Sequence, residues 1–114
     1  MSNEVPVSVH TTGGKTVVDI DTDNVDFRNA EVLKTKLTEL VHGGESQIIL
    51  NLSRVNFMDS SGLSVLLTGK RVTEEAGGSF SICGLQGYVS NLISLTNLNK
   101  TIAVFPTTNE AVLG

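Results

Sequence analysis

The fold of this chain is decided by one stretch, Val55-Asn56-Phe57-Met58-Asp59-Ser60-Ser61-Gly62-Leu63-Ser64-Val65-Leu66-Leu67. Just before it, residues 47–53 place isoleucine and leucine side chains on one side of an extended chain, which is typical of a core strand. Within and after it, residues 61–76 carry Leu63, Leu66 and Leu67 at helical spacing. The stretch therefore predicts a strand that passes through a short loop into a helix.

The Asp59-Ser60-Ser61-Gly62 step lies where this helix is predicted to begin, and its residue types leave two interpretations open. Asp and Ser are preferred helix caps, because their side-chain oxygens accept hydrogen bonds from backbone N–H groups that lack a partner. On this interpretation Ser60 or Ser61 is only a cap, worth about 1 kcal/mol. Alternatively, a serine hydroxyl at the positive end of the helix dipole is a place where a phosphate is tolerated without unfolding the helix.

The residues around this step resemble the signature of STAS domains, the family of the anti-sigma-factor antagonists. The resemblance rests on Phe57-Met58-Asp59-Ser60-Ser61-Gly62-Leu63 and on the residues before it, Ile49-Leu50-Asn51-Leu52-Ser53 and Val55. It extends to Asp26-Phe27-Arg28-Asn29-Ala30-Glu31-Val32-Leu33-Lys34, which is similar to the family's Asp-x-x-x-Ala-x-x-Leu at the start of its first helix. With the order of the predicted elements, the resemblance covers nearly the whole chain.

The resemblance implies a regulatory function that depends on switching partners. The unphosphorylated protein would bind an anti-sigma factor with serine kinase activity and so release the sigma factor for RNA polymerase. The kinase would phosphorylate Ser60, the first serine of the pair, and break the complex. A phosphatase acting on the phosphoserine would reset it. The partner-binding residues that the resemblance implies are Asp26, Asp59, Ser60, Ser61 and Gly62.

Each of these residues has an expected role. Asp59 would orient the neighbouring hydroxyl and help the kinase to recognise it, and Ser61 and Gly62 would shape the helix start. Gly62 would also let a partner approach closely. Asp26 is a candidate for the contact surface, although capping of the first helix explains it equally well. The chain lacks the glycine that the family has shortly before this aspartate and has Asp23-Asn24-Val25 instead, so the partner surface at this edge is expected to differ.

Length and composition limit the other possibilities. At 114 residues we expect one domain, residues 1–114, and the net charge of −4 disfavours nucleic acid or an anionic membrane surface as a partner. We find no signal peptide and no apolar run long enough for a membrane span. Cys83 is the one cysteine, which excludes an internal disulfide and fits a reducing cytosol. The expected location is cytoplasmic, and Cys83 is expected to be a small buried residue.

The pattern of the whole chain predicts an α/β fold with a STAS-like mixed β-sheet of about 4–5 strands packed against about 4 α-helices. Val5, Val7 and Val9 begin the first strand, which Pro6 favours at a sheet edge. Further strands are expected at residues 16–20, 47–53, 79–83 and 102–105. Helices are expected at residues 27–42, 61–76, 87–95 and 109–113.

The sequence carries no pattern that favours catalysis. The histidines, His10 and His42, fall at a strand end and a helix end, and Gly62-Leu63-Ser64-Val65-Leu66 lacks the last glycine of a nucleophile elbow. The spacer from Gly62 to Gly69-Lys70-Arg71 is too long for a phosphate-binding loop. The aspartates at residues 19–26 lack the glycine and glutamate of a calcium loop. We therefore expect no enzyme activity, no cofactor and no metal.

Two other functions stay open on the sequence alone. One is a non-catalytic STAS scaffold subunit of a stress-sensing or lipid-transport assembly, in which phosphorylation is secondary or absent. The other is nucleotide binding, which has been suggested for STAS domains but which no phosphate-cradling loop supports here.

Overall fold

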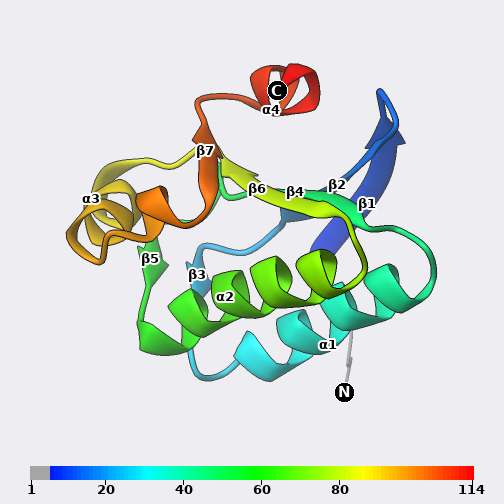
Figure 1. Cartoon of the computed structure of the whole chain (residues 1–114). Helices are drawn as coiled ribbons and strands as arrows, with labels where there is room; N and C mark the ends of the chain where they lie inside the picture. The colour runs from blue at the N-terminus through cyan, green and yellow to red at the C-terminus, as the bar shows by residue number, and fades with distance from the viewer. Residues whose placement is uncertain (1–5) are drawn as a thin grey trace.

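A computed structural model describes residues 6–114, and the predicted strand residue Val5 lies outside this range. Five strands form the main sheet in the order β1-β2-β4-β6-β7 (Figure 1). β1 pairs antiparallel with β2, and every other neighbouring pair is parallel. The predicted mixed sheet is confirmed, and β1 lies at its edge as expected. The strand bounds are β1 Val7–Thr12, β2 Lys15–Ile20, β4 Gln47–Asn51, β6 Ser79–Cys83 and β7 Ala103–Phe105.

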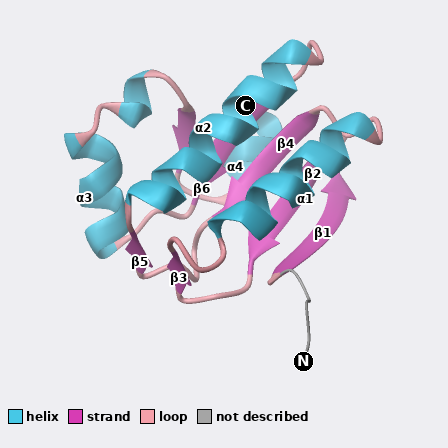
Figure 2. Cartoon of the chain, turned by 90° about the horizontal axis from the view of Figure 1, so that it is seen from below, coloured by secondary structure: helices cyan, strands magenta, loops and turns pink. Residues whose placement is uncertain are grey.

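In the described part of the chain, four α-helices pack around this sheet, as the sequence predicts. Helices α1 (Ala30–His42) and α2 (Ser60–Glu75) lie side by side on one face, and α4 (Thr108–Leu113) lies on the other (Figures 1 and 2). Helix α3 (Gly87–Leu95) and a 3₁₀ helix, η1 (Leu98–Lys100), lie at one end of the sheet. In residues 6–114 every helix is too short or too polar to span a lipid bilayer.

The main core fills the space between the sheet and the α1–α2 layer. β4 runs through the centre of the sheet, and Ile48, Ile49 and Leu50 are each 1% exposed. Ile49 points to the opposite face from its neighbours, where it joins a smaller cluster under α4 with Val17 and Cys83. A central parallel strand is covered on both faces, so it is apolar throughout instead of alternating.

Local differences from the sequence prediction have identifiable causes. Leu67 belongs to the leucine pattern that predicts α2 but is 46% exposed. The residues that α2 buries are Gly62, Val65, Leu66, Gly69, Val72 and Thr73. α1 begins at Ala30 and not at residue 27, because Asp26 and Asn29 hold the preceding residues in a turn.

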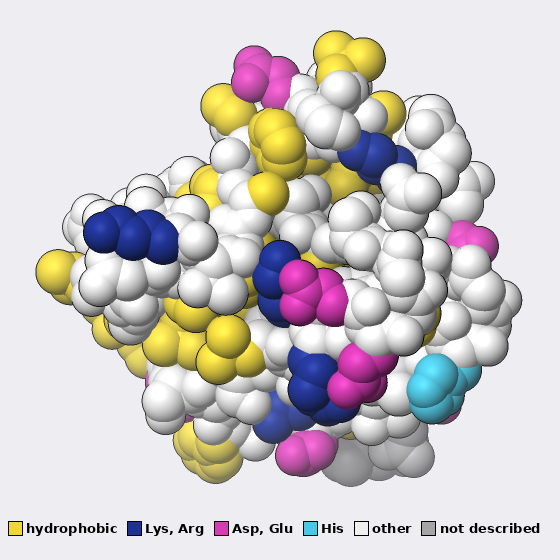
Figure 3. All heavy atoms as spheres, in the orientation of Figure 1, with side chains coloured by type: hydrophobic (Ala, Val, Ile, Leu, Met, Phe, Trp, Pro, Cys, Tyr) yellow, Lys and Arg dark blue, Asp and Glu magenta, His cyan; other side chains and the backbone are white. Residues whose placement is uncertain are grey.

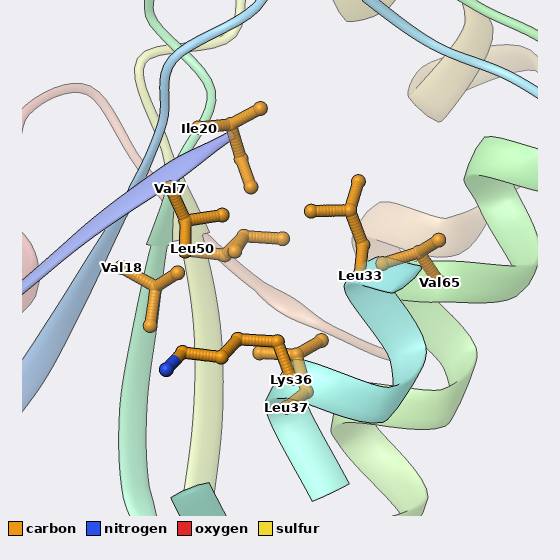
Figure 4. Close-up of a pocket in the computed structure, with 8 residues that line it drawn as sticks. All are labelled: Val7, Val18, Ile20, Leu33, Lys36, Leu37, Leu50 and Val65. Atoms are coloured by element: carbon orange, nitrogen blue, oxygen red, sulfur yellow. The ribbon is translucent and has the colours of Figure 1, made fainter. Parts of the chain in front are cut away.

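A narrow apolar pocket opens between the β1–β2 pair and α1 (Figure 4). Lys36 extends its aliphatic stem from α1 across the gap and carries the one charged group of the lining. A ligand site needs several convergent polar groups, and the lining of this pocket offers only the Lys36 ammonium, so we assign the pocket to the edge of the core. The lining residues are Val7, Val18, Ile20, Leu33, Lys36, Leu37, Leu50 and Val65.

Candidate functional site

The Asp-Ser-Ser-Gly step forms the first turn of α2, and Asp59 is the residue that caps it. Asp59 has extended backbone angles, and its Oδ1 accepts hydrogen bonds from the backbone N–H of Ser61 at 2.9 Å and of Gly62 at 3.1 Å. The backbone N–H of Leu63 then bonds to the Asp59 carbonyl at 3.1 Å. The interpretation in which Ser60 or Ser61 serves as the cap is therefore wrong, because the aspartate before them already fills that role.

This cap leaves the Ser60 hydroxyl available for chemistry. Ser60 is the first residue of α2 and is exposed, whereas Ser61 is half-buried. Two residues before Ser60, Met58 is completely buried and fixes the loop to the core. The Ser60 hydroxyl can therefore be reached from solvent without opening the fold, whereas Ser61 is less accessible.

Gly62 is buried, and the structure gives it a role in packing that the sequence did not predict. A Cβ atom at this position would lie 2.3 Å from Met58 Cγ and 2.5 Å from the backbone carbonyl oxygen of Val25. Real Cβ atoms do not approach other atoms so closely, so only glycine lets α2 begin this near to the preceding strand. Gly62 is therefore required for the internal packing of α2, and its role in the close approach of a partner stays a prediction.

A second, two-stranded parallel sheet brings the start of α1 beside the Ser60 loop. It pairs β3 (Asn24–Val25) with β5 (Phe57–Met58), and the backbone N–H of Asp59 bonds to the Val25 carbonyl at 3.3 Å. Asn24, which stands near where the family has its glycine, is thus part of an extended strand. The sequence did not predict this pairing, because two-residue strands have no recognisable period.

Asp26 follows β3 directly and is paired with Arg28. Its side chain accepts hydrogen bonds from the Arg28 backbone N–H at 2.9 Å, the Arg28 guanidinium at 2.7 Å and the Asn24 amide at 2.7 Å. The side-chain and backbone hydrogen bonds from Arg28 hold the pKa of Asp26 at about 2, below its ordinary value. Asp26 is only 5% exposed, whereas the Arg28 side chain is 65% exposed. A molecule that docks here would therefore contact the Arg28 guanidinium before the Asp26 carboxylate.

Exposed aromatic rings border the same region. Phe57 in β5 stacks on Tyr88 in α3, with ring centroids 5.4 Å apart and ring planes 11° apart. The two residues remain 45% and 51% exposed, and Phe27 beside Asp26 is 75% exposed. Figure 3 shows hydrophobic side chains gathered over α3 and the neighbouring part of α2. This cluster of exposed rings was not predicted from the sequence, because Tyr88 belongs to a segment far from Phe57 along the chain.

Among residues 6–114, the remaining reactive groups do not assemble an acid–base site around Ser60. His10 lies 3.6 Å from Asp19 on the β1–β2 pair, and His42 ends α1. Cys83 is fully buried beside Thr108, and burial raises the pKa of its thiol. Within the part of the chain that the structure describes, no three His, Cys, Asp or Glu side chains gather as metal ligands.

The comparisons with known proteins agree on one family. The family model of the STAS domain matches residues 6–111. The anti-sigma-B factor antagonist of Bacillus subtilis is 30% identical over 80 residues, which are 70% of this chain and 72% of that protein. The anti-sigma F factor antagonist of Paenibacillus polymyxa is 26% identical over 82 residues, 71% and 70% of the two chains. The crystal structure of an anti-sigma factor antagonist from Mycobacterium paratuberculosis matches with a TM-score of 0.83 at 25% identity, over 94% of this chain and 90% of that one.

Proposed function

This chain belongs to the STAS domain family, and we propose that it is an anti-sigma-factor antagonist whose binding is switched off by phosphorylation of Ser60. The observation that carries the proposal is the exposed Ser60 at the first position of α2, with Asp59 already serving as the cap. The curated relatives named as anti-sigma factor antagonists support the same function.

In this proposal the partner is an anti-sigma factor with serine kinase activity. The unphosphorylated protein binds it and frees the sigma factor, the kinase transfers phosphate from ATP to Ser60, and a phosphoserine phosphatase restores the binding form. The protein itself is a non-catalytic regulator, a single STAS domain over residues 1–114 that works in the cytoplasm. Asp26, Asp59, Ser61 and Gly62 remain the proposed surroundings of the contact, with Gly62 acting through the packing of α2.

The geometry suggests how a phosphate would disrupt binding. A phosphoserine adds a charge of about −1.5 to −2. The Asp59 carboxylate already accepts hydrogen bonds from the Ser61 and Gly62 N–H groups, so a phosphate on Ser60 competes with it for the positive helix end. We infer that the phosphate extends away from the helix toward the docked partner.

The charges around the loop refine this picture. Two carboxylates, Asp26 and Asp59, belong to the proposed surroundings of Ser60. Asp26 is paired with Arg28, so Asp59 contributes most of the like-charge repulsion on the phosphate. Burying a phosphate under a partner also costs desolvation energy. A loss of about 2–3 kcal/mol weakens binding by roughly 30- to 150-fold, which is enough for a switch.

A pull-down from native lysate tests the proposal, with wild type, Ser60→Ala, Ser60→Asp and Thr35→Asp as baits. Thr35 is exposed in the middle of α1, so its aspartate variant adds the same charge away from the Ser60 loop. We expect an anti-sigma factor kinase with wild type, Ser60→Ala and Thr35→Asp, and its loss with Ser60→Asp. Capture of the same assembly or transporter subunit by all four baits would refute the switch and favour the scaffold alternative.

Phosphate transfer by the captured kinase provides a second test. Incubation with the purified kinase and ATP should add one phosphate to wild type and to Ser61→Ala, and none to Ser60→Ala, as measured by intact-protein mass. Incorporation into Ser60→Ala at the wild-type rate would move the phosphoacceptor to another residue.

A further inference from the structure

The stacked pair of Phe57 and Tyr88 is built from two segments that meet only in the folded protein. Phe57 precedes Ser60 by three residues in β5, and Tyr88 lies in the first turn of α3. Helices α2 and α3 both pack against β5. The stack therefore adjoins the start of α2, where the phosphoacceptor lies.

About half of each of the two residues stays open to solvent although their rings stack on each other. Phe57 is 45% exposed and Tyr88 is 51% exposed, at a centroid distance of 5.4 Å. The polar residues beside the pair, Asn56 and Gln86, are exposed and uncharged. Aromatic side chains with few charges among them are typical of the centre of a protein interface, and aromatic residues dominate binding hot spots.

The stack is also held in place before any partner arrives. Val89 and Ile93 anchor α3 in the core at 0% and 1% exposure. The Gln86 side-chain amide, just before α3, donates a hydrogen bond to the Ser53 carbonyl at 2.6 Å, which fixes the helix start to the loop after β4. Rings that are fixed in the free protein lose little conformational entropy on binding, so their contact area contributes more fully to affinity.

We propose that the Phe57–Tyr88 stack is an anchor of the partner interface and inserts into an apolar pocket of the kinase-type anti-sigma factor. This inference rests on the proposed function, because the occupant is assigned by continuity with the Ser60 contact. One docked protein covers both the rings and Ser60. The phosphate therefore acts at the rim of an interface whose affinity comes largely from the aromatic pair.

The test measures the dissociation constant of the purified kinase-type anti-sigma factor for wild type, Tyr88→Ala, Tyr88→Lys and Leu95→Ala. Leu95 is the matched control, since it is 81% exposed at the far end of the same helix. We expect Tyr88→Ala to weaken binding about 30-fold, as for a typical hot spot. Leu95→Ala should bind like wild type. Tyr88→Lys keeps a long side chain at this exposed helical position, and should bind at least as weakly as Tyr88→Ala while remaining folded by circular dichroism.

The outcomes separate this inference from the proposed function. Wild-type affinity of both Tyr88 variants, together with release by Ser60→Asp, would refute the anchor and leave the switch intact. A lower melting temperature of Tyr88→Ala with unchanged affinity would also refute it, because the stack would then be purely structural. Self-association of wild type that Tyr88→Ala abolishes, with kinase affinity unchanged, would assign the surface to a second copy instead. Failure of wild type to bind any such kinase would overturn the proposed function and this inference with it.

Discussion

Replacing Gly62 with alanine is the sharpest test of how the start of α2 is built. The new Cβ would lie 2.3 Å from Met58 Cγ and 2.5 Å from the Val25 carbonyl oxygen. Met58 has no free space to move into because it is fully buried, and the Val25 carbonyl accepts the Asp59 N–H bond that joins β3 to the loop. Both contacts must therefore be relieved by shifting α2 away from the small sheet.

The magnitude follows from two opposing terms. Overpacking in a dense core costs about 1–3 kcal/mol, and a clash with backbone belongs at the upper end of that range. Alanine is favoured over glycine within a helix by about 1 kcal/mol, which offsets part of the loss. We therefore expect Gly62→Ala to lower the free energy of unfolding by about 2 kcal/mol.

Urea denaturation followed by circular dichroism measures this change. For a domain with an m-value of about 2 kcal/mol/M, the midpoint should fall by about 1 M. Ser61→Ala, at the preceding position, is the control and should shift stability by less than about 0.5 kcal/mol, since its hydroxyl does not cap the helix. A Gly62→Ala variant as stable as wild type but weaker in partner binding would refute the packing argument and restore the role in partner approach.

Three further predictions concern charged and reactive groups. Asp59→Ala should lower the free energy of unfolding by about 1–2 kcal/mol in urea melts, because the Ser61 and Gly62 N–H groups lose their cap; an unchanged midpoint would contradict this. The depressed pKa of Asp26, about 2, means that its ion pair with Arg28 stabilises the fold fully above about pH 4 and is lost as the pH falls toward 2. Asp26→Asn should therefore show a shallower loss of stability between pH 4 and 2 than wild type, and equal slopes would refute the assignment. Cys83 should react with iodoacetamide far more slowly in the folded protein than in urea, since burial raises its pKa; equal rates would place the thiol at the surface.

The sequence alone determined the elements that have a regular apolar period. β6 and α3 lie at the predicted residues, and α2 ends one residue earlier than expected. The periodicity of apolar residues reports burial directly, because a helix or strand that packs on one side repeats every 3.6 or 2 residues. The motif at residues 57–63 also placed Ser60 at a helix start, and the structure puts it there, exposed. Its phosphorylation stays a prediction.

The spacing of apolar residues did not predict which residues are buried where the buried residues do not follow a regular repeat. The spacing of Leu63, Leu66 and Leu67 predicted the helix, yet α2 packs against α1 and β6 with Leu66 buried and Leu67 exposed to solvent. Ile49 was not predicted as a core residue, because the short α4 covers the far face of β4 and a strand buried on both faces shows no alternation.

Only the tertiary structure decided which residues surround Ser60. The pairing of β3 with β5 places Asp26 beside the Ser60 loop, where Asp26 is buried. Helix α3, which lies far along the chain, places Tyr88 against Phe57. The tertiary structure also shows that position 62 must be glycine, because a Cβ atom there would clash with Val25 and Met58. Local sequence fixes the conformation of each segment, but contacts between distant segments arise from the crossover connections of a parallel sheet, and no local period encodes them.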